Sequence, residues 1–227
     1  MKFRVGYFIA LFLLITTGVP LYLFYFKYNE LNAIVISLIF FLALNSLICI
    51  WEISLGLNIN LIKKDYEKLK GKYKQQRGVA VMNFFLDSLD FTTTFSLPYW
   101  SKVWSIYSLF DPSYSNQESF GFFVDVGNGW TTLIPSILFI ACIVDHTILD
   151  PKVIGMIGLI KFYQELYGTC IYFLSYIYNK RYIGSVLWVS LSFVTIANGI
   201  WFAFPLLGMY ACSQMIMTDT YEIFHLK

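Results

Sequence analysis

Charge and histidine are scarce in this sequence. Of its 227 residues, 13% are charged and only His146 and His225 are histidines. His146 is expected in a loop and His225 lies near the C-terminus, so both are expected to be solvated rather than catalytic. The chain also lacks a P-loop, a GxSxG motif, a metal-ligand constellation and a nucleic-acid-binding signature. We therefore expect no metal, no cofactor and no nucleic-acid partner.

Cysteine is equally rare. All four cysteines lie in or beside apolar segments, and none is part of a CxxC pair: Cys49, Cys142, Cys170 and Cys212. This pattern argues against a zinc site and against a disulfide framework. The thiols are expected to be small packing groups.

What the chain has in abundance is apolar sequence. Its hydrophobic share is 58% and its mean hydropathy is +0.63, which is typical of a polytopic membrane protein. The apolar runs lack the alternation of barrel strands, so the predicted fold is an all-α bundle. Five runs have about the 20 residues that a helix needs to cross a bilayer. These expected spans are 5–26, 33–57, 121–144, 153–176 and 185–210.

The distribution of basic residues predicts how this single domain, residues 1–227, is oriented. The first span is expected to be retained, because its apolar run is long and shows no signal-peptide cleavage site. Five spans place the basic residues of the N-terminus, of segment 63–77 and of the last loop on one face. Only Lys27, Lys152 and Lys227 lie on the other face, so the first face is predicted to be cytoplasmic. The expected membrane is the endoplasmic reticulum in a eukaryote or the inner membrane in a bacterium.

The long connection at 58–120 is expected to lie at the cytoplasmic surface. Its basic segment 63–77 either touches anionic headgroups or is an ordinary solvated loop. The apolar stretch 79–100 carries two aspartates and is expected to form an interfacial or re-entrant helix that stops at Pro98. A sixth span here is disfavoured, because it would move the basic residues of the last loop to the outside.

Polar side chains inside apolar spans are the candidate functional residues, because charge is costly in lipid. In the second span Asn45, Cys49 and Glu52 share one helix face. In the third span Asp125, Asn128, Thr132 and Ser136 do the same, and Gly127 and Gly129 are expected to allow close approach of another helix or of a ligand.

The last two spans continue this pattern. The fourth carries Lys161 and Glu165 four residues apart, a pair that can neutralise itself, followed by Tyr172 on the same stripe. The fifth carries Asn198 and Trp201. Turning every polar stripe inward predicts an internal polar cavity. The alternative is that these groups act only as interhelical glue, worth about 0.6 to 2 kcal/mol each.

Several motifs resemble the emopamil-binding protein family, whose members share the EXPERA domain. They are Trp104, Tyr107, Asp111 and Tyr114, followed eleven residues later by Asp125; LYGTCIYFL at 166–174; and NGIWFAFP at 198–205. The similarity extends over about residues 44–215. The family includes the sterol isomerase that moves a ring double bond from Δ8 to Δ7.

The resemblance implies a five-helix fold around a sterol-sized cavity. Glu52 and Asp125 match the family's acids on the second and third helices and are the expected catalytic residues. Asn198 and Trp201 match the pair on the last helix that faces the ligand. The complete set of expected ligand-binding residues is Asn45, Tyr107, Asn128, Glu165, Tyr172, Asn198 and Trp201.

Two departures from the family pattern keep a second function open. The isomerase has a histidine one turn before the second-helix acid, whereas this chain has Ile48. The third-helix acid is Asp125 rather than glutamate, which is longer by one methylene. The first hypothesis is therefore an isomerase-like enzyme acting on a sterol or isoprenoid lipid. The alternatives are a non-catalytic lipid-binding or accessory protein of the same fold and a structural subunit. The expected partners are a hydrophobic small molecule, membrane lipid and, in a homodimer, a second copy of the chain.

Overall fold

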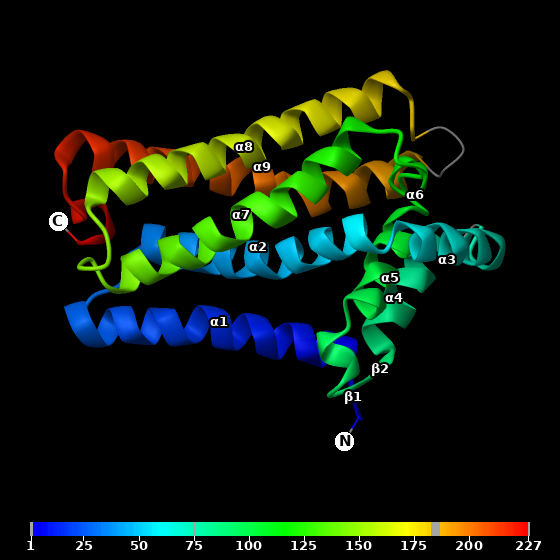
Figure 1. The fold of residues 1–227 in the computed structure, drawn as a ribbon, viewed down its shortest axis with the longest axis horizontal. Coiled ribbons are helices and arrows are strands. Elements are labelled where there is room, and N and C mark those ends of the chain that lie inside the picture. The colour runs from blue at the N-terminus through cyan, green and yellow to red at the C-terminus, as the bar shows by residue number, and fades with distance from the viewer. Residues whose placement is uncertain (1, 75, 183–186, 227) are drawn as a thin grey trace.

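Five long helices lie side by side in the computed structural model, which describes residues 2–74, 76–182 and 187–226 (Figure 1). The long helices are α1 (Val5–Tyr28), α2 (Ala33–Leu57), α7 (Phe120–Val144), α8 (Pro151–Tyr178) and α9 (Leu187–Thr218). The shorter elements are β1 (Lys2–Arg4), α3 (Ile59–Lys72), α4 (Arg77–Leu86), β2 (Ser88–Asp90), η1 (Thr93–Phe95), α5 (Leu97–Tyr107), α6 (Ser113–Asn116) and η2 (Glu222–Phe224).

The chain is an all-α membrane protein apart from one two-stranded ladder. Among the described residues, four helical segments are long and apolar enough to cross a bilayer: Val5–Tyr28, Ala33–Leu57, Phe120–Val144 and Val194–Thr218. Helix α8 has 28 residues but is more polar, and it is not one of the four. The first residues of the expected span 185–210, residues 185 and 186, lie outside the described residues.

Side-chain caps explain where three of the long helices begin, α2, α7 and α8. The Asn32 side chain accepts from Val35 N at 2.8 Å at the start of α2, and Ser119 Oγ accepts from Phe122 N at 3.0 Å at the start of α7. Such caps satisfy backbone N–H groups that have no partner within the helix. At the start of α8, Asp150 is the cap and proline follows at the first helical position, where its missing N–H costs nothing.

The connection at 58–120 folds into more than the single interfacial helix predicted from the sequence. It contains α3, α4, α5 and α6, and Pro98 begins α5 instead of ending a helix. Strand β2 pairs antiparallel with β1, with Phe3 opposite Leu89, and so ties the connection to the N-terminus. Trp104 Nε1 on α5 donates to the carbonyl oxygen of Trp51 on α2 at 2.6 Å. The connection is therefore packed against the bundle at one of its ends.

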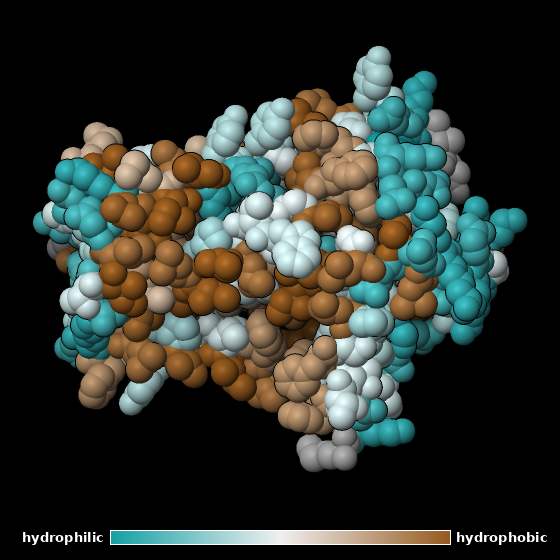
Figure 2. Space-filling model, in the orientation of Figure 1, coloured by the Kyte–Doolittle hydropathy of each residue, from teal (hydrophilic) through white to brown (hydrophobic). Residues whose placement is uncertain are grey.

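Polar residues cover both ends of the bundle and apolar residues cover its middle (Figure 2). Helices α3 to α6, the N-terminal strand β1 and the end of α8 share one end, which we call the basic end (Figure 1). It carries the lysines of α3 and also Lys102 and Arg181. The opposite end holds Lys27, paired with Asp145, and Lys152; Lys227 lies outside the described residues. The basic end matches the face predicted to be cytoplasmic, and its sidedness stays a prediction.

The sequence positions of the two histidines suggested that both are solvated. In the structure both are instead partly buried. They meet at the end opposite the basic end, where the C-terminal segment folds back on the bundle (Figure 1). The His146 ring stacks on Tyr221 with centroids 4.2 Å apart and lies 5.1 Å from the ring of His225. His225 Nδ1 contacts the Glu30 carboxylate. Burial, reinforced by the nearby His225 and Lys27, lowers the pKa of His146 from its usual 6.5 to about 4.

This lowered pKa predicts a loss of stability in weak acid. Above pH 6.5 His146 is neutral in both the folded and the unfolded chain, so it contributes no pH dependence there. As the pH falls from 6.5 towards 4, the unfolded chain takes up a proton that the folded chain excludes, so the free energy of unfolding decreases. Thermal unfolding of the protein in detergent micelles measures this slope.

A His146→Phe variant is the matched control, because phenylalanine keeps a ring to stack on Tyr221 but does not titrate. It is expected to unfold at nearly the same temperature at pH 6.5 and pH 5. The neighbouring carboxylates of Glu30 and Asp145 have lowered pKa values because of their hydrogen bonds, Glu30 to Leu226 N and Asp145 to Lys27. Their contribution is therefore lost only in stronger acid. An equal slope in both proteins between pH 6.5 and 5 would show that His146 is not its source.

Candidate functional site

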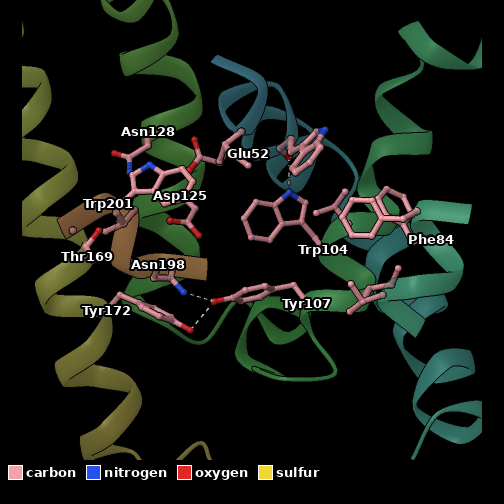
Figure 3. Close-up of a pocket in the computed structure, with 18 residues that line it drawn as sticks. Glu52, Phe84, Trp104, Tyr107, Asp125, Asn128, Thr169, Tyr172, Asn198 and Trp201 are labelled. Carbon is pink, nitrogen blue, oxygen red and sulfur yellow. Dashed lines mark hydrogen bonds between the residues drawn. The ribbon is translucent and has the colours of Figure 1, made fainter. Parts of the chain in front are cut away.

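A pocket of about 250 Å³ lies between the long helices and the packed connection (Figure 3). Six helices contribute to it: α2, α4, α5, α7, α8 and α9. Seven of the nine residues expected in the site line it: Glu52, Tyr107, Asp125, Asn128, Tyr172, Asn198 and Trp201. Asn45 and Glu165 do not line it.

Glu52 stands where α2 and α7 come closest. A Cβ atom built on Gly129 of α7 would lie 2.8 Å from Glu52 Cβ and 2.8 Å from the backbone nitrogen of Ile53. Glycine is therefore required here by the close approach of the two helices. Asp125 lies one helical turn before Gly129, so the same contact brings both carboxyl groups to one side of the pocket (Figure 3). Glu52 Oε2 is buried and has no hydrogen-bond partner among the described residues.

This contact predicts different effects for the two glycines that the sequence singled out. Gly129→Ala must push α2 and α7 apart and is expected to cost about 1–3 kcal/mol of stability, as overpacking does. A Cβ on Gly127 meets nothing within 4 Å, in contrast to the close approach expected there. Gly127→Ala is therefore the control, and it should be neutral or stabilising by up to about 1 kcal/mol, because alanine favours helix. Thermal unfolding in detergent distinguishes them; equal melting temperatures would contradict the close contact.

Asp125 is held by a tyrosine from the packed connection. Tyr114 Oη donates to Asp125 Oδ2 at 2.6 Å. The Tyr114 ring in turn stacks on Trp104, with centroids 5.2 Å apart and planes at 12°. The orientation of the carboxyl group is thus fixed by residues outside the long helices. Among the residues that the structure describes, no lysine or arginine lines the pocket to neutralise Asp125 or Glu52.

Asn128 lies one turn from Asp125 in the α7 helix and is tied to α8. Its side-chain oxygen accepts from Gln164 Nε2 at 2.7 Å, and its backbone oxygen accepts from Thr132 Oγ1 at 2.9 Å. Asn128 lines the pocket, and its Nδ2 group carries two donor hydrogens.

Tyr107, Tyr172 and Asn198 form a hydrogen-bonded group at the basic end of the pocket (Figure 3). The hydroxyl oxygens of Tyr107 and Tyr172 are 2.8 Å apart, and Asn198 Nδ2 donates to Tyr107 Oη at 3.1 Å. These residues come from α5, α8 and α9. Three chain segments that are distant in sequence therefore meet at one point.

Asn45 and Glu165 belong to a separate buried network on the far side of Trp201. Asn45 Nδ2 donates to Glu165 Oε1 at 2.8 Å, and Lys161 Nζ donates to Glu165 Oε2 at 2.8 Å. Trp201 Nε1 donates to Asn45 Oδ1 at 3.0 Å. The indole thus separates the two regions and connects them. Both residues act on the pocket through Trp201, not by lining it.

The sequence did not place several lining residues in the site. Trp104 lines the pocket, and Tyr114 contacts it only through Asp125. Both belong to the motif that carries the family resemblance, but their packing role was not inferred from it. Helix α4 supplies one apolar side of the pocket with Val81, Phe84 and Phe85, opposite Glu52 and Asp125 (Figure 3). No sequence signal identified this helix as part of the site, because its position depends on how the connection folds back.

The arrangement is that of a small-molecule pocket with a few convergent polar groups in an apolar lining. Two carboxyl groups and three indole rings, those of Trp51, Trp104 and Trp201, face or border the same space. No cluster of three or more metal-binding side chains occurs in the part of the chain that the structure describes. Comparison with protein-family models, with curated proteins and with solved structures found no match for this chain.

Proposed function

We propose that this protein is a membrane-embedded isomerase that moves a carbon–carbon double bond in a sterol or similar polycyclic or isoprenoid lipid by proton transfer. In this proposal α8 also crosses the membrane, which brings the number of spans to five, and the pocket is the internal polar cavity of an EXPERA-like fold. Glu52 and Asp125 are the acid and the base.

The reaction needs only these two groups. One carboxyl group, holding its proton when the substrate binds, adds that proton to one carbon of the double bond and leaves a carbocation. The other, ionised, removes a proton from the carbon on the opposite side of the cationic centre, and the electrons of that C–H bond form the new double bond. Atoms and charge balance without an oxidant, a reductant or a metal. Positioned acids and bases of this kind contribute about 10²- to 10⁴-fold each.

The observation that carries the proposal is that two carboxyl groups share one pocket whose described lining residues include no lysine or arginine. A structural role alone would favour neutralising each acid locally, as Lys161 does for Glu165. The indole of Trp201 borders the same space, and an aromatic face stabilises a passing positive charge. These features fit a carbocation between two acids better than they fit helix packing.

The apolar lining supports a hydrophobic substrate. Valine, isoleucine and phenylalanine side chains of α4 and α5 face the carboxyl groups. Phe85 lines the pocket and is also 40% exposed on the surface. A lipid too large for the enclosed volume would therefore extend past Phe85 towards the surrounding bilayer.

Non-catalytic lipid binding is the second candidate, and one observation favours it. Ile48 lines the pocket where the resembling isomerase has a histidine. An aliphatic side chain at that position removes one group that orients or transfers protons, but it leaves a ligand site intact.

Isotope exchange separates these two functions. The purified protein in lipid nanodiscs is incubated in D₂O with cholest-8-en-3β-ol, and the recovered sterol is analysed by mass spectrometry. An isomerase incorporates deuterium at carbon, whereas a binding protein returns the sterol unlabelled. Nanodiscs carrying no protein provide the background. Unlabelled sterol, together with retention of the sterol on the protein, would favour the binding function.

A further inference from the structure

A chain of hydrogen bonds leads from the pocket to the basic end of the bundle. Asn198 Nδ2 donates to Tyr107 Oη at 3.1 Å, and Tyr107 Oη lies 2.8 Å from Tyr172 Oη. Tyr172 Oη donates to Asp111 Oδ2 at 3.3 Å, and Arg181 Nη1 lies 3.4 Å from the same oxygen. Asp111 is fully buried, whereas the Arg181 side chain is 13% exposed. The proposed function uses only the pocket end of this chain.

Asp111 sets the direction of the chain because its carboxylate only accepts. Its Oδ1 atom receives hydrogen bonds from Ser113 N at 3.1 Å and from Ser113 Oγ at 2.6 Å. Its Oδ2 atom accepts hydrogen bonds from Tyr172 Oη and from the Arg181 guanidinium, which has only donors and no acceptor atom. Four donor groups, Ser113 N, Ser113 Oγ, Tyr172 Oη and Arg181 Nη1, therefore surround this carboxyl group. The single hydroxyl proton of Tyr172 therefore points to Asp111.

The remaining bonds follow from counting protons. Since Tyr172 uses its proton on Asp111, the hydrogen bond between the two tyrosines must be donated by Tyr107. Tyr107 then accepts from Asn198, whose second amide hydrogen goes to the backbone oxygen of Val194 at 2.8 Å. A backbone carbonyl oxygen only accepts, so this bond also fixes which side-chain atom of Asn198 is nitrogen. Both amide hydrogens of Asn198 are thus used within the protein.

We infer that the polar group of the ligand at this end of the pocket is a hydrogen-bond donor, a hydroxyl group, and that Asp111 determines this selectivity from outside the pocket. The only polar atom that Asn198 can still offer to a ligand is Oδ1, an acceptor. The hydroxyl proton of Tyr107 is directed away to Tyr172. An alcohol therefore finds a partner here, whereas a ketone brings a second acceptor against Asn198 Oδ1. The inference rests on the pocket assigned in the proposed function.

Binding of a matched alcohol and ketone tests this selectivity. Equilibrium binding of tritiated cholest-8-en-3β-ol to the protein in nanodiscs is measured first, followed by its displacement by cholest-8-en-3-one. The alcohol is expected to bind about 10-fold tighter or more, because the ketone leaves a buried acceptor unsatisfied. A ketone that binds as tightly as the alcohol would overturn the inference, and so would binding of neither sterol.

Two variants test whether the chain is the cause. Tyr172→Phe removes the hydroxyl oxygen that accepts the hydrogen bond from Tyr107. The Tyr107 hydroxyl can then donate to a ketone, while Asn198 Oδ1 can still accept from an alcohol. In Asp111→Asn the amide can donate to Tyr172, and the order of the chain can reverse. Either variant is expected to bring the two affinities to within about 3-fold. Asp111 lies outside the pocket, so a purely structural role would change both affinities together, without changing their ratio.

Tyr176→Phe is the matched control. Tyr176 is one turn after Tyr172 on α8, it is buried, and its hydroxyl has no hydrogen-bond partner among the described residues. Its loss should leave the alcohol-to-ketone ratio unchanged. A ratio that persists in Tyr172→Phe contradicts the role of the chain. This experiment measures binding, so its outcome is independent of the deuterium experiment. If the protein prefers the alcohol but incorporates no deuterium, only the proposed catalysis is contradicted. If it incorporates deuterium but does not prefer the alcohol, only this inference is contradicted.

Discussion

Asp125→Asn is expected to lower the rate of the proposed double-bond migration by about 10²- to 10⁴-fold, the usual contribution of a positioned acid or base. Asparagine has the size of aspartate and can still accept the hydrogen bond that Tyr114 Oη donates at 2.6 Å. The pocket should therefore keep its shape, and sterol affinity should change little. What is lost is the ability to take up or release a proton. The rate is followed as deuterium incorporated into the sterol in D₂O.

Two further variants serve as controls for the loss of rate in Asp125→Asn. Tyr114→Phe keeps the acid but removes its hydrogen bond, and should reduce the rate less than Asp125→Asn does. Asp65→Asn makes the same chemical change on α3 at the basic end, in an ion pair with Lys68. It should leave the rate unchanged, because Asp65 does not line the pocket. Full activity of Asp125→Asn would exclude Asp125 as acid or base.

The long helices could be predicted from the sequence because their signals are local. Apolar runs of about 25 residues, preceded by capping residues such as Asn32 and Ser119, define where each helix lies. Pro98 was interpreted wrongly because a proline fits equally well at the end of one helix or in the first turn of the next. In the structure the Ser96 side chain accepts from Tyr99 N at 3.4 Å and caps α5, and Trp104 on the same helix donates to Trp51 of α2, a residue more than 50 positions away.

Helix periodicity made only part of the candidate site predictable, namely which face of each helix points inward. Periodicity identified the inward faces that carry Glu52, Asp125 and Asn198, but a shared face does not give depth along the helix axis. Asn45 therefore lies two turns from Glu52, on the far side of Trp201, where it binds Glu165 instead of facing the pocket. The contribution of α4 was not predictable, because it depends on how a 63-residue connection packs.

Loss of Lys161 is expected to be among the most destabilising single changes in the bundle. Its side chain is 2% exposed, its ammonium group lies 2.8 Å from Glu165 Oε2, and the Glu165 side chain is fully buried. Lys161→Met fills a similar volume but leaves the carboxylate with only the amide of Asn45 as a charge-stabilising partner. Removing one member of a buried ion pair costs about 3–5 kcal/mol. Unfolding by SDS in mixed micelles measures this loss.

Two comparisons show whether the unpaired Glu165 carboxylate causes the instability of Lys161→Met. Lys152 and Asp219 form an ion pair of similar length at the opposite end, with side chains 51% and 47% exposed. Lys152→Met should cost no more than about 1 kcal/mol, as exposed pairs do.

The double variant Lys161→Met, Glu165→Leu removes both buried charges and should recover most of the stability lost by Lys161→Met alone. It should lower ligand affinity, because Glu165→Leu removes the acceptor that helps Asn45 to orient Trp201. If the double variant were as unstable as the single one, the instability would come from lost packing and not from an unpaired charge.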